Sequence, residues 1–319
     1  MSIYLVTGGA GFIGSNIVEE LVNQGARVRV IDNFSTGHLE NLRTFRNRVD
    51  FRELDICNLA DLKKAVEGVD YILHQAAIPS VPRSVIDPIG SHNADVTGTL
   101  HVLWAAKEAG VKRVVYAASS SAYGDSEQLP KEEAMRVSPI SPYGLMKYMG
   151  EEYCQLFTSL YSLETVSLRY FNVFGPRQDP TSQYSGVLSR FITAMICGQR
   201  PVIFGDGEQS RDFTHVSNVV RANLLACHSS KAVGEVHNVA CGERITLNKV
   251  VEILNRLLGT HLEPVYEPAR TGDIRHSMAD IKRAKTNLNY SPTVGFEEGL
   301  RQTVDWYRDY LKRPKNKAY

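Results

Sequence analysis

The chain has 319 residues, with 36 lysines and arginines against 35 aspartates and glutamates, so its formal net charge is +1. This length can bury a sizeable core in one large or two modest domains, and the balanced charge argues against nucleic acid or a membrane surface as the main partner. Its apolar runs are far shorter than a membrane span, and its five scattered cysteines lack metal-ligand spacing, so we expect a cytoplasmic protein with reduced thiols and no metal site.

The first predicted unit is a strand, a glycine-rich turn and a helix in immediate succession. Residues 3–6 form a short apolar run typical of a buried strand, and residues 7–14 read TGGAGFIG. Apolar side chains then recur at helical spacing through residues 16–23. A dinucleotide-binding fingerprint requires this order, and the alternative is a glycine-rich turn without a ligand.

Each glycine of the fingerprint has a physical role. Gly8 permits the tight turn, Gly11 lets the backbone approach a pyrophosphate, and Gly14 lets the helix pack closely against the strand. The free N–H groups and the positive dipole at the start of the helix favour phosphate. We therefore expect Phe12 and Ile13 to contact the nucleotide as well.

A second predicted strand, at residues 27–31, ends at Asp32. A carboxylate at this position accepts hydrogen bonds from an adenosine ribose and repels a 2′-phosphate, which favours NAD over NADP. The polar loop that follows is expected to complete this part of the site through Asn33, Ser35, Thr36 and Gly37.

A third strand, at residues 49–54, leads to Asp55 and Ile56, which are also expected at the cofactor. Asp55 could meet the adenine amino group, or it could equally cap the helix that begins near Leu59. A fourth strand, at residues 69–74, runs into a segment whose small residues would allow the backbone to approach a cofactor, namely Gln75, Ala76 and Ala77.

Helices and strands continue to alternate along the chain. The pattern predicts a helix at 94–109, a strand at 111–118, a long helix at about 142–161 and a strand at 164–170. This alternation predicts an α/β fold with a doubly wound parallel sheet of the Rossmann type. After Asn172 the pattern is shorter and more mixed, which predicts a smaller mixed α/β domain beside the ligand cleft.

Five side chains are candidates for catalysis. Tyr143 and Lys147 are four residues apart on one helix and therefore share a face, while Ser119, Ser120 and Ser121 follow the end of a strand. An ammonium beside a tyrosine can lower the pKa of the phenol well below about 10, and a serine hydroxyl can hold the substrate oxygen while the proton moves. Taken alone, a tyrosine and a lysine at this spacing are more often a surface pair.

These motifs, in this order, resemble the extended short-chain dehydrogenase/reductase family. The segments that carry the resemblance are 7–14, 32–33, 119–124, 141–147 and 169–176. More narrowly, the chain is similar to the UDP-galactose 4-epimerase group, and most similar to its UDP-N-acetylglucosamine 4-epimerases. The segments that carry this closer resemblance are 80–84, 116–121, 177–180 and 272–277.

The resemblance implies a reaction that needs tightly bound NAD. Tyr143 takes the proton of the sugar 4-hydroxyl while the hydride passes to NAD, and the 4-keto sugar then turns over and takes the hydride back on its other face. Lys147 and Tyr170 are implied at the cofactor, and Ser119 beside the substrate hydroxyl. In the related 4,6-dehydratases an Asp-Glu pair occupies the positions of Ser120 and Ser121, so the serines here argue against dehydration.

The resemblance also implies the contacts of a UDP-sugar substrate. Asn172 would meet the diphosphate, Arg211 and Arg270 would neutralise phosphates, and Asp273 would meet the uridine ribose. The alternative is that these arginines form internal ion pairs, Arg211 with Asp212 and Arg270 with Asp273. The remaining residues implied at the substrate are Ser80, Arg83, Ser121, Tyr143, Val187, Val202, Phe204 and Ser277.

Two positions bear on the sugar. Ser277 falls where enzymes that reject N-acetyl sugars have a bulky tyrosine, so it would leave room for an acetamido group. Asp179 falls where glucuronate 4-epimerases carry an arginine, so it would repel a sugar carboxylate. Either residue could instead face solvent in a loop. The alternatives are a UDP-glucose 4-epimerase, a UDP-glucuronate 4-epimerase or decarboxylase, and a regulator that binds NAD without chemistry.

The resemblance implies two domains and a homodimer. Residues 1–171 would bind NAD, with 212–238 returning to that domain, and residues 172–211 and 239–319 would bind the nucleotide sugar. The helices at 94–109 and 142–161 would pair across a two-fold axis. The alternative is that their apolar residues pack only within the chain's own core; these are Val102, Leu103, Met146, Met149 and Leu156.

Overall fold

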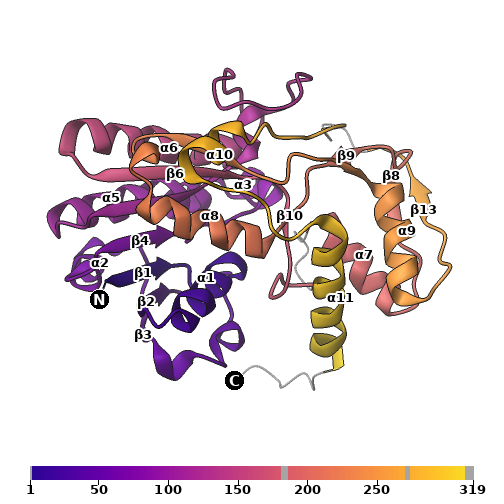
Figure 1. Ribbon diagram of the computed structural model, residues 1–319, viewed down its shortest axis with the longest axis horizontal. Coiled ribbons are helices and arrows are strands. Elements are labelled where there is room, and N and C mark those ends of the chain that lie inside the picture. Colours follow the sequence, from indigo (N-terminus) through magenta and orange to yellow (C-terminus); the bar gives the residue numbers. More distant parts are fainter. Residues whose placement is uncertain (1, 181–185, 270–273, 313–319) are drawn as a thin grey trace.

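A seven-stranded parallel sheet forms the centre of the computed structural model, which describes residues 2–180, 186–269 and 274–312 (Figure 1). The strands lie in the order β11-β6-β5-β4-β1-β2-β3, and every neighbouring pair is parallel. They are β1 (Ile3–Thr7), β2 (Arg27–Asp32), β3 (Asp50–Glu53), β4 (Tyr71–His74), β5 (Arg113–Ser119), β6 (Glu164–Tyr170) and β11 (Val236–Val239). The predicted doubly wound parallel fold is confirmed, and the strand order reverses between β1 and β4.

Helices cover both faces of this sheet, because strands with apolar residues on both sides must be buried on both sides. On one face lie α1 (Phe12–Asn23), α8 (Val216–His228) and α10 (Lys282–Leu288), and their buried residues share one core with the sheet. The other face is covered by α2 (Leu59–Val66), α5 (Gly98–Glu108) and α6 (Pro142–Tyr161), which form a second core. In Figure 1 the strand arrows point towards the smaller part of the molecule.

The smaller part has its own core between α7 (Val187–Ile196), α9 (Leu247–Leu258) and α11 (Phe296–Lys312). Three two-stranded pairings surround it: β7 (Val173–Phe174) with β10 (Thr214–His215), β8 (Val202–Phe204) with β13 (Val265–Glu267), and β9 (Ser210–Arg211) with β12 (Ile245–Thr246). Between β10 and β12 the chain returns to the large sheet through α8 and β11.

Short helical segments complete the described chain: η1 (Leu39–Leu42), η2 (Arg46–Arg48), α3 (Val81–Ile86), α4 (Pro88–His92), η3 (Asn93–Thr97), η4 (Ser120–Tyr123) and η5 (Ser230–Ala232). The predictions for the long helix and the sixth strand match α6 and β6 residue for residue. The helix predicted at 94–109 is instead divided: η3 is a π-helical turn, and α5 begins only at Gly98. The first helix begins at Phe12, four residues earlier than its apolar pattern indicates.

The position of α6 is fixed by a buried ion pair and by a glycine. The Arg169 guanidinium on β6 donates two hydrogen bonds, of 2.9 and 2.6 Å, to the Glu151 carboxylate on α6, and both side chains are almost fully buried. Removing one partner of such a pair would leave an uncompensated buried charge. A Cβ at Gly150 would lie 2.2 Å from the hydroxyl oxygen of Tyr116, so only glycine allows α6 to lie this close to β5.

All five cysteines are free thiols. No helix in the described ranges is both long enough and apolar enough to cross a membrane.

Candidate active site

The glycine turn after β1 forms a cradle of bare backbone. Gly8 has a φ of +65°, and a Cβ there would lie 2.7 Å from the Cα of Ala76, which follows β4. A Cβ at Gly14 would lie 2.2 Å from the carbonyl oxygen of Gly8. The N-cap of α1 is Gly11, which has no side chain to cap the first N–H groups of the helix. Those groups can therefore bind the phosphates of a dinucleotide, and the cradle fits the cofactor that the sequence predicts.

Asp32 lies at the end of β2, with its carboxylate directed at the same turn. The oxygen Oδ2 accepts the N–H of Ala10 at 2.9 Å, and Oδ1 accepts the N–H of Phe34 at 2.8 Å. Gly37 covers this carboxylate so closely that a Cβ there would lie 2.9 Å from both oxygens. A carboxylate has about four acceptor positions, so Asp32 can still accept ribose hydroxyls, as predicted.

The loop after β2 is joined to the end of β3. The side-chain amide of Asn33 donates to Asp55 at 2.9 Å, and the N–H of Ser35 donates back to the Asn33 side chain. The suggestion that Asp55 caps the next helix is wrong, because the cap of α2 is Asn58, whose side chain accepts the N–H of Asp61. Contact of Asp55 with adenine stays a prediction. Thr36 is exposed in the same loop, and Ile56 is buried directly after Asp55.

A chain of hydrogen bonds fixes the segment after β4. The N–H of Ala76 donates to the Thr7 hydroxyl, which is 2.7 Å from Nδ1 of His74. The other ring nitrogen of His74 is 3.0 Å from the Thr99 hydroxyl, which donates to the Asp95 carbonyl at 2.6 Å. Burial lowers the pKa of His74 to about 3, so the imidazole is neutral at physiological pH. This chain was not predicted, because Thr7, His74 and Thr99 are far apart in the sequence.

Two further predicted cofactor residues contact each other. The Tyr170 hydroxyl at the end of β6 donates to the side-chain oxygen of Gln75 at 3.2 Å, and both side chains bond to Asn223 of α8. Ala77 follows in the same half-buried segment. Asn223 is a residue that the sequence reasoning missed, since it belongs to a helix that follows the predicted sheet.

The three serines and Tyr143 are brought together at the end of β5. The N–H of Ser121 donates to the Ser119 hydroxyl at 3.1 Å, which forms a tight turn through Ser120. The first turn of α6 lies directly against it: a Cβ at Gly144 would be 2.7 Å from the Ser121 carbonyl oxygen. The Tyr143 phenol lies near Ser119: burial raises the pKa of the phenol most, and its interaction with the Ser119 hydroxyl lowers it. Gly144 was missed because its role depends on a neighbour in space.

The expected effect of Lys147 on the Tyr143 phenol is not what the structure shows. Burial raises the pKa of Tyr143 above its usual value, and the Asp95 carboxylate raises it further. The Lys147 ammonium instead donates to the carbonyl of Ala117 on β5 at 2.9 Å and lies 5.1 Å from the centre of the Tyr116 ring. The prediction that this phenol is acidic is therefore wrong for the protein alone, because burial and the Asp95 carboxylate outweigh the Ser119 hydroxyl.

The predicted substrate residues divide into two groups. Ser80 caps α3 by accepting the N–H of Arg83 at 3.1 Å, and Ser84 of the same helix accepts the Tyr143 N–H at 3.0 Å. These residues therefore lie beside the serine turn. Val187 begins α7, and Val202 and Phe204 lie on β8, all in the smaller part of the molecule.

Asn172 and Arg211 lie where the two parts of the molecule meet. The Asn172 amide donates to the Asp212 carbonyl at 3.0 Å, and Arg211 donates to the carbonyls of Ser210 and Arg275. Three backbone N–H groups, from Cys241, Gly242 and Ala279, bind the Asp212 carboxylate. The carboxylate thus has a structural role in holding these segments together. Arg270 and Asp273 lie outside the described residues.

Ser277 and Asp179 have different surroundings. The N–H of Ser277 donates to the Ser210 carbonyl at 3.0 Å, which places this small residue next to Arg211. The carboxylate of Asp179 lies 3.4 Å from Nε2 of His38, on the loop that follows β2. This pairing raises the pKa of His38, and the repulsion of a sugar carboxylate by Asp179 stays a prediction.

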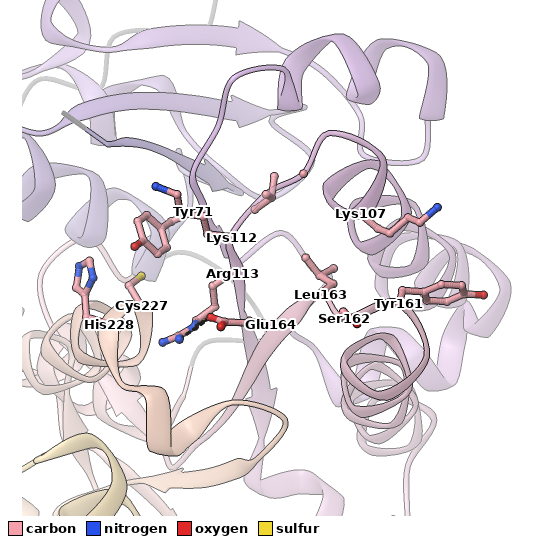
Figure 2. A pocket seen from close by; sticks show the side chains of 12 residues that line it. Tyr71, Lys107, Lys112, Arg113, Tyr161, Ser162, Leu163, Glu164, Cys227 and His228 are labelled. Carbon is pink, nitrogen blue, oxygen red and sulfur yellow. Dashed lines mark hydrogen bonds and ion pairs between the residues drawn. The ribbon is translucent and has the colours of Figure 1, made fainter.

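A cavity of about 560 Å³ lies at the opposite edge of the sheet, where β4, β5 and β6 begin (Figure 2). Two of its basic side chains are ion-paired, Lys112 at 2.9 Å from Asp70 and Arg113 at 2.6 Å from Glu164, and the Lys107 ammonium lies 4.8 Å from the centre of the Trp104 ring. We therefore place no phosphate ligand there.

In the part of the chain that the structure describes, no group of three or more His, Cys, Asp or Glu residues could hold a metal ion.

The chain is also similar to known proteins. Residues 4–241 match the model of the NAD dependent epimerase/dehydratase family. The chain is 37% identical over 314 residues to a UDP-glucose 4-epimerase of Mycolicibacterium smegmatis, covering 96% of this chain and 98% of that protein. It is 34% identical over 329 residues to a UDP-glucuronate 4-epimerase of Thermodesulfobacterium geofontis, covering 99% of each.

A solved structure is also similar over nearly the whole chain. It is the UDP-N-acetylglucosamine 4-epimerase of Methanobrevibacter ruminantium in complex with UDP-N-acetylmuramic acid, with a TM-score of 0.93 and 40% identity. The match covers 97% of this chain and 99% of that one.

The substitution Gly14→Ala should release the dinucleotide. Its methyl group would meet the Gly8 carbonyl, so the cradle must open, and we expect a free energy of unfolding lower by about 1–3 kcal/mol. Nucleotide content after denaturation, measured by ultraviolet absorbance and mass spectrometry, should fall to background. The control is Gly295→Ala, where no atom lies within 4 Å of the added Cβ. Full nucleotide content in Gly14→Ala would contradict the cradle.

Proposed function

The chain belongs to the NAD dependent epimerase/dehydratase family, and on this basis we propose that it inverts the 4-hydroxyl of a UDP-sugar, with UDP-N-acetylglucosamine and UDP-N-acetylgalactosamine as the preferred pair. The observation that carries the proposal is the contact between the serine turn and the first turn of α6, which joins Ser119 to Tyr143 beside the dinucleotide cradle. Free cysteines support a cytoplasmic location.

The chain's own residues move the proton and hold the reactants. The chemistry that NAD supplies when bound is reversible acceptance of the hydride from C4 of the sugar. Tyr143 takes the proton of the 4-hydroxyl and gives it back, and Ser119 holds the same oxygen through a hydrogen bond. Lys147 contributes a buried positive charge beside this tyrosine. Because burial favours the neutral phenol, the base form of Tyr143 must draw its stabilisation from positive charge on this side of the sheet.

Three observations favour epimerisation of an N-acetylated UDP-sugar over dehydration. Ser120 and Ser121 provide hydroxyls at the turn where a dehydratase would need a carboxylic acid, so this site can exchange a proton with Tyr143 but lacks a second acid there. The side chain at position 277, held beside Ser210, is a small serine, which suits a sugar with an acetamido group. The similar structure from Methanobrevibacter ruminantium bears the name of a UDP-N-acetylglucosamine 4-epimerase, which also favours this pair.

The substrate proposal is tested by following three UDP-sugars separately with proton NMR. We expect UDP-N-acetylglucosamine to yield UDP-N-acetylgalactosamine without added NAD, and UDP-glucose to react more slowly. UDP-glucuronate tests the alternative function, a glucuronate 4-epimerase, which the relative from Thermodesulfobacterium geofontis suggests. Conversion of UDP-glucuronate alone would reject the hexosamine assignment, and release of carbon dioxide from it would indicate a decarboxylase.

Replacing Tyr143 by phenylalanine should abolish turnover while leaving the cofactor in place. The ring still fills the same volume, but no oxygen remains to take the proton, so we expect kcat to fall by about 10²- to 10⁴-fold. Nucleotide content and thermal unfolding should match those of the unaltered protein. A variant that kept its nucleotide and its turnover would show that Tyr143 is not the base.

We also propose that the protein is a homodimer through α6. Val102, Leu103 and Met146 are buried in the chain's own core, but Leu156 and Leu160 are 45% and 64% exposed. Exposed leucines on one helix suit a contact with the same helix of a second copy. The double substitution Leu156→Glu and Leu160→Glu should halve the mass measured by light scattering, whereas Leu39→Glu, at an exposed leucine of η1, should not. A monomeric unaltered protein would reject the dimer.

A further inference from the structure

Asp95 is a buried carboxylic acid that the proposed reaction does not use. It lies in the π-helical turn η3, which packs against α6, and the residue is only 1% exposed. Single π-helical turns are rare and occur frequently at functional sites. The turn separates α4 from α5 and places Asp95 in a segment that packs against α6, the helix that carries Tyr143 and Lys147.

The hydrogen bonds of Asp95 are incomplete in the described residues. Its oxygen Oδ1 accepts the N–H of Ile78 at 2.7 Å, but Oδ2 has no hydrogen-bond partner among them. A buried carboxylate with an unpaired oxygen is costly unless opposite charge lies close by. Burial raises the pKa of Asp95, and the positive groups that lower it again are Lys147 of α6 and Arg83 of α3.

Burial disfavours the positive charge of Lys147, as it disfavours the negative charge of Asp95. Burial lowers the pKa of its ammonium, and Asp95 is the foremost of the groups that raise it again, ahead of Glu151 and Cys154. Glu151 is already bound by two hydrogen bonds to Arg169, and burial raises the pKa of the Cys154 thiol to about 12, so neither offers a free negative charge. Asp95 is thus the carboxylate that acts on Lys147 from within the site.

The same carboxylate acts on Tyr143 with the opposite consequence. A negative charge nearby disfavours the phenolate, so Asp95 raises the pKa of Tyr143, while the Ser119 hydroxyl lowers it. The other titratable groups that sense Asp95 are Tyr116 of β5 and Cys57 before α2, and burial raises the pKa of both. Neither of these is ionised at neutral pH, so the charges that matter are those of Asp95, Lys147 and Arg83.

We propose that Asp95 is a positioning residue of the reaction: its carboxylate keeps Lys147 charged inside a buried site and holds Tyr143 as a neutral phenol when no substrate is bound. The inference rests on the proposed function for its kinetic consequences, but the charge coupling itself does not depend on turnover. If the role of Asp95 were purely structural, it would only accept the N–H of Ile78, and an asparagine could do the same through its side-chain oxygen.

The test is Asp95→Asn in the holoenzyme, with the pH dependence of kcat/KM as the first measurement. Loss of the carboxylate lets Tyr143 ionise at lower pH and lets Lys147 lose its proton at lower pH, so both limbs of the profile should move to lower pH by about one unit. The matched control is Thr99→Val, which removes the hydrogen bond to the Asp95 carbonyl but keeps the charge; its limbs should not move. Limbs unchanged in Asp95→Asn would overturn the proposal.

Two NMR measurements on the same proteins do not need turnover. The Tyr143 ¹³Cζ signal, assigned with Tyr143→Phe, should begin its shift towards tyrosinate at lower pH in Asp95→Asn than in the unaltered holoenzyme. In the unaltered holoenzyme the Asp95 ¹³Cγ signal should be that of a carboxylate at pH 7, which keeps the test valid if the variant does not fold. A protonated Asp95 at pH 7 would overturn the proposal. So would a Tyr143 signal that shifts at the same pH in Asp95→Asn as in the unaltered holoenzyme. Absence of epimerase activity with these shifts intact would reject only the proposed function.

Discussion

The close approach of α6 to β5 is the constraint on which the rest of the site depends. Two glycines make it possible: Gly144 lies against the Ser121 backbone, and Gly150 lies against the Tyr116 hydroxyl. The buried Arg169–Glu151 pair then holds the helix at this distance from the neighbouring strand β6. Since the tyrosine and the lysine project from the same face of that helix, a shift of α6 would remove both from the serine turn at once.

Burial works against both groups that the reaction needs. It favours neutral phenol at Tyr143 and neutral amine at Lys147, so the site must obtain its charges from neighbours rather than from water. Asp95 supplies negative charge to the lysine, and Lys147 and Arg83 supply positive charge to Asp95. The chemistry of the site therefore follows from a small network of charges in a poorly solvated volume rather than from one ammonium beside one phenol.

Local patterns in the sequence predicted the elements of the large sheet, because hydrophobic periodicity and glycine turns depend on near neighbours. They found the glycine cradle, Asp32 and the bounds of α6 and β6. They missed the π-turn at Asn93–Thr97, the role of Gly144 and the charge on Asp95, because these depend on contacts between distant segments. The direction of the Tyr143 pKa was wrong for the same reason: the spacing of two residues carries no information about how much water surrounds them.

His74 has a consequence that reaches beyond its own strand. The Thr99 hydroxyl already gives its proton to the Asp95 carbonyl, so His74 must donate to Thr99 through Nε2 and accept from Thr7 through Nδ1. From the Ala76 N–H to the Asp95 carbonyl, each group of this chain then donates to the next one. A second proton on the His74 ring, at Nδ1, would remove the acceptor of the Thr7 hydroxyl. Because burial lowers its pKa to about 3, the His74 imidazole stays neutral at physiological pH and does not respond to acidity there. It links the ends of β1 and β4, where the strand order reverses, to the turn η3 that carries Asp95.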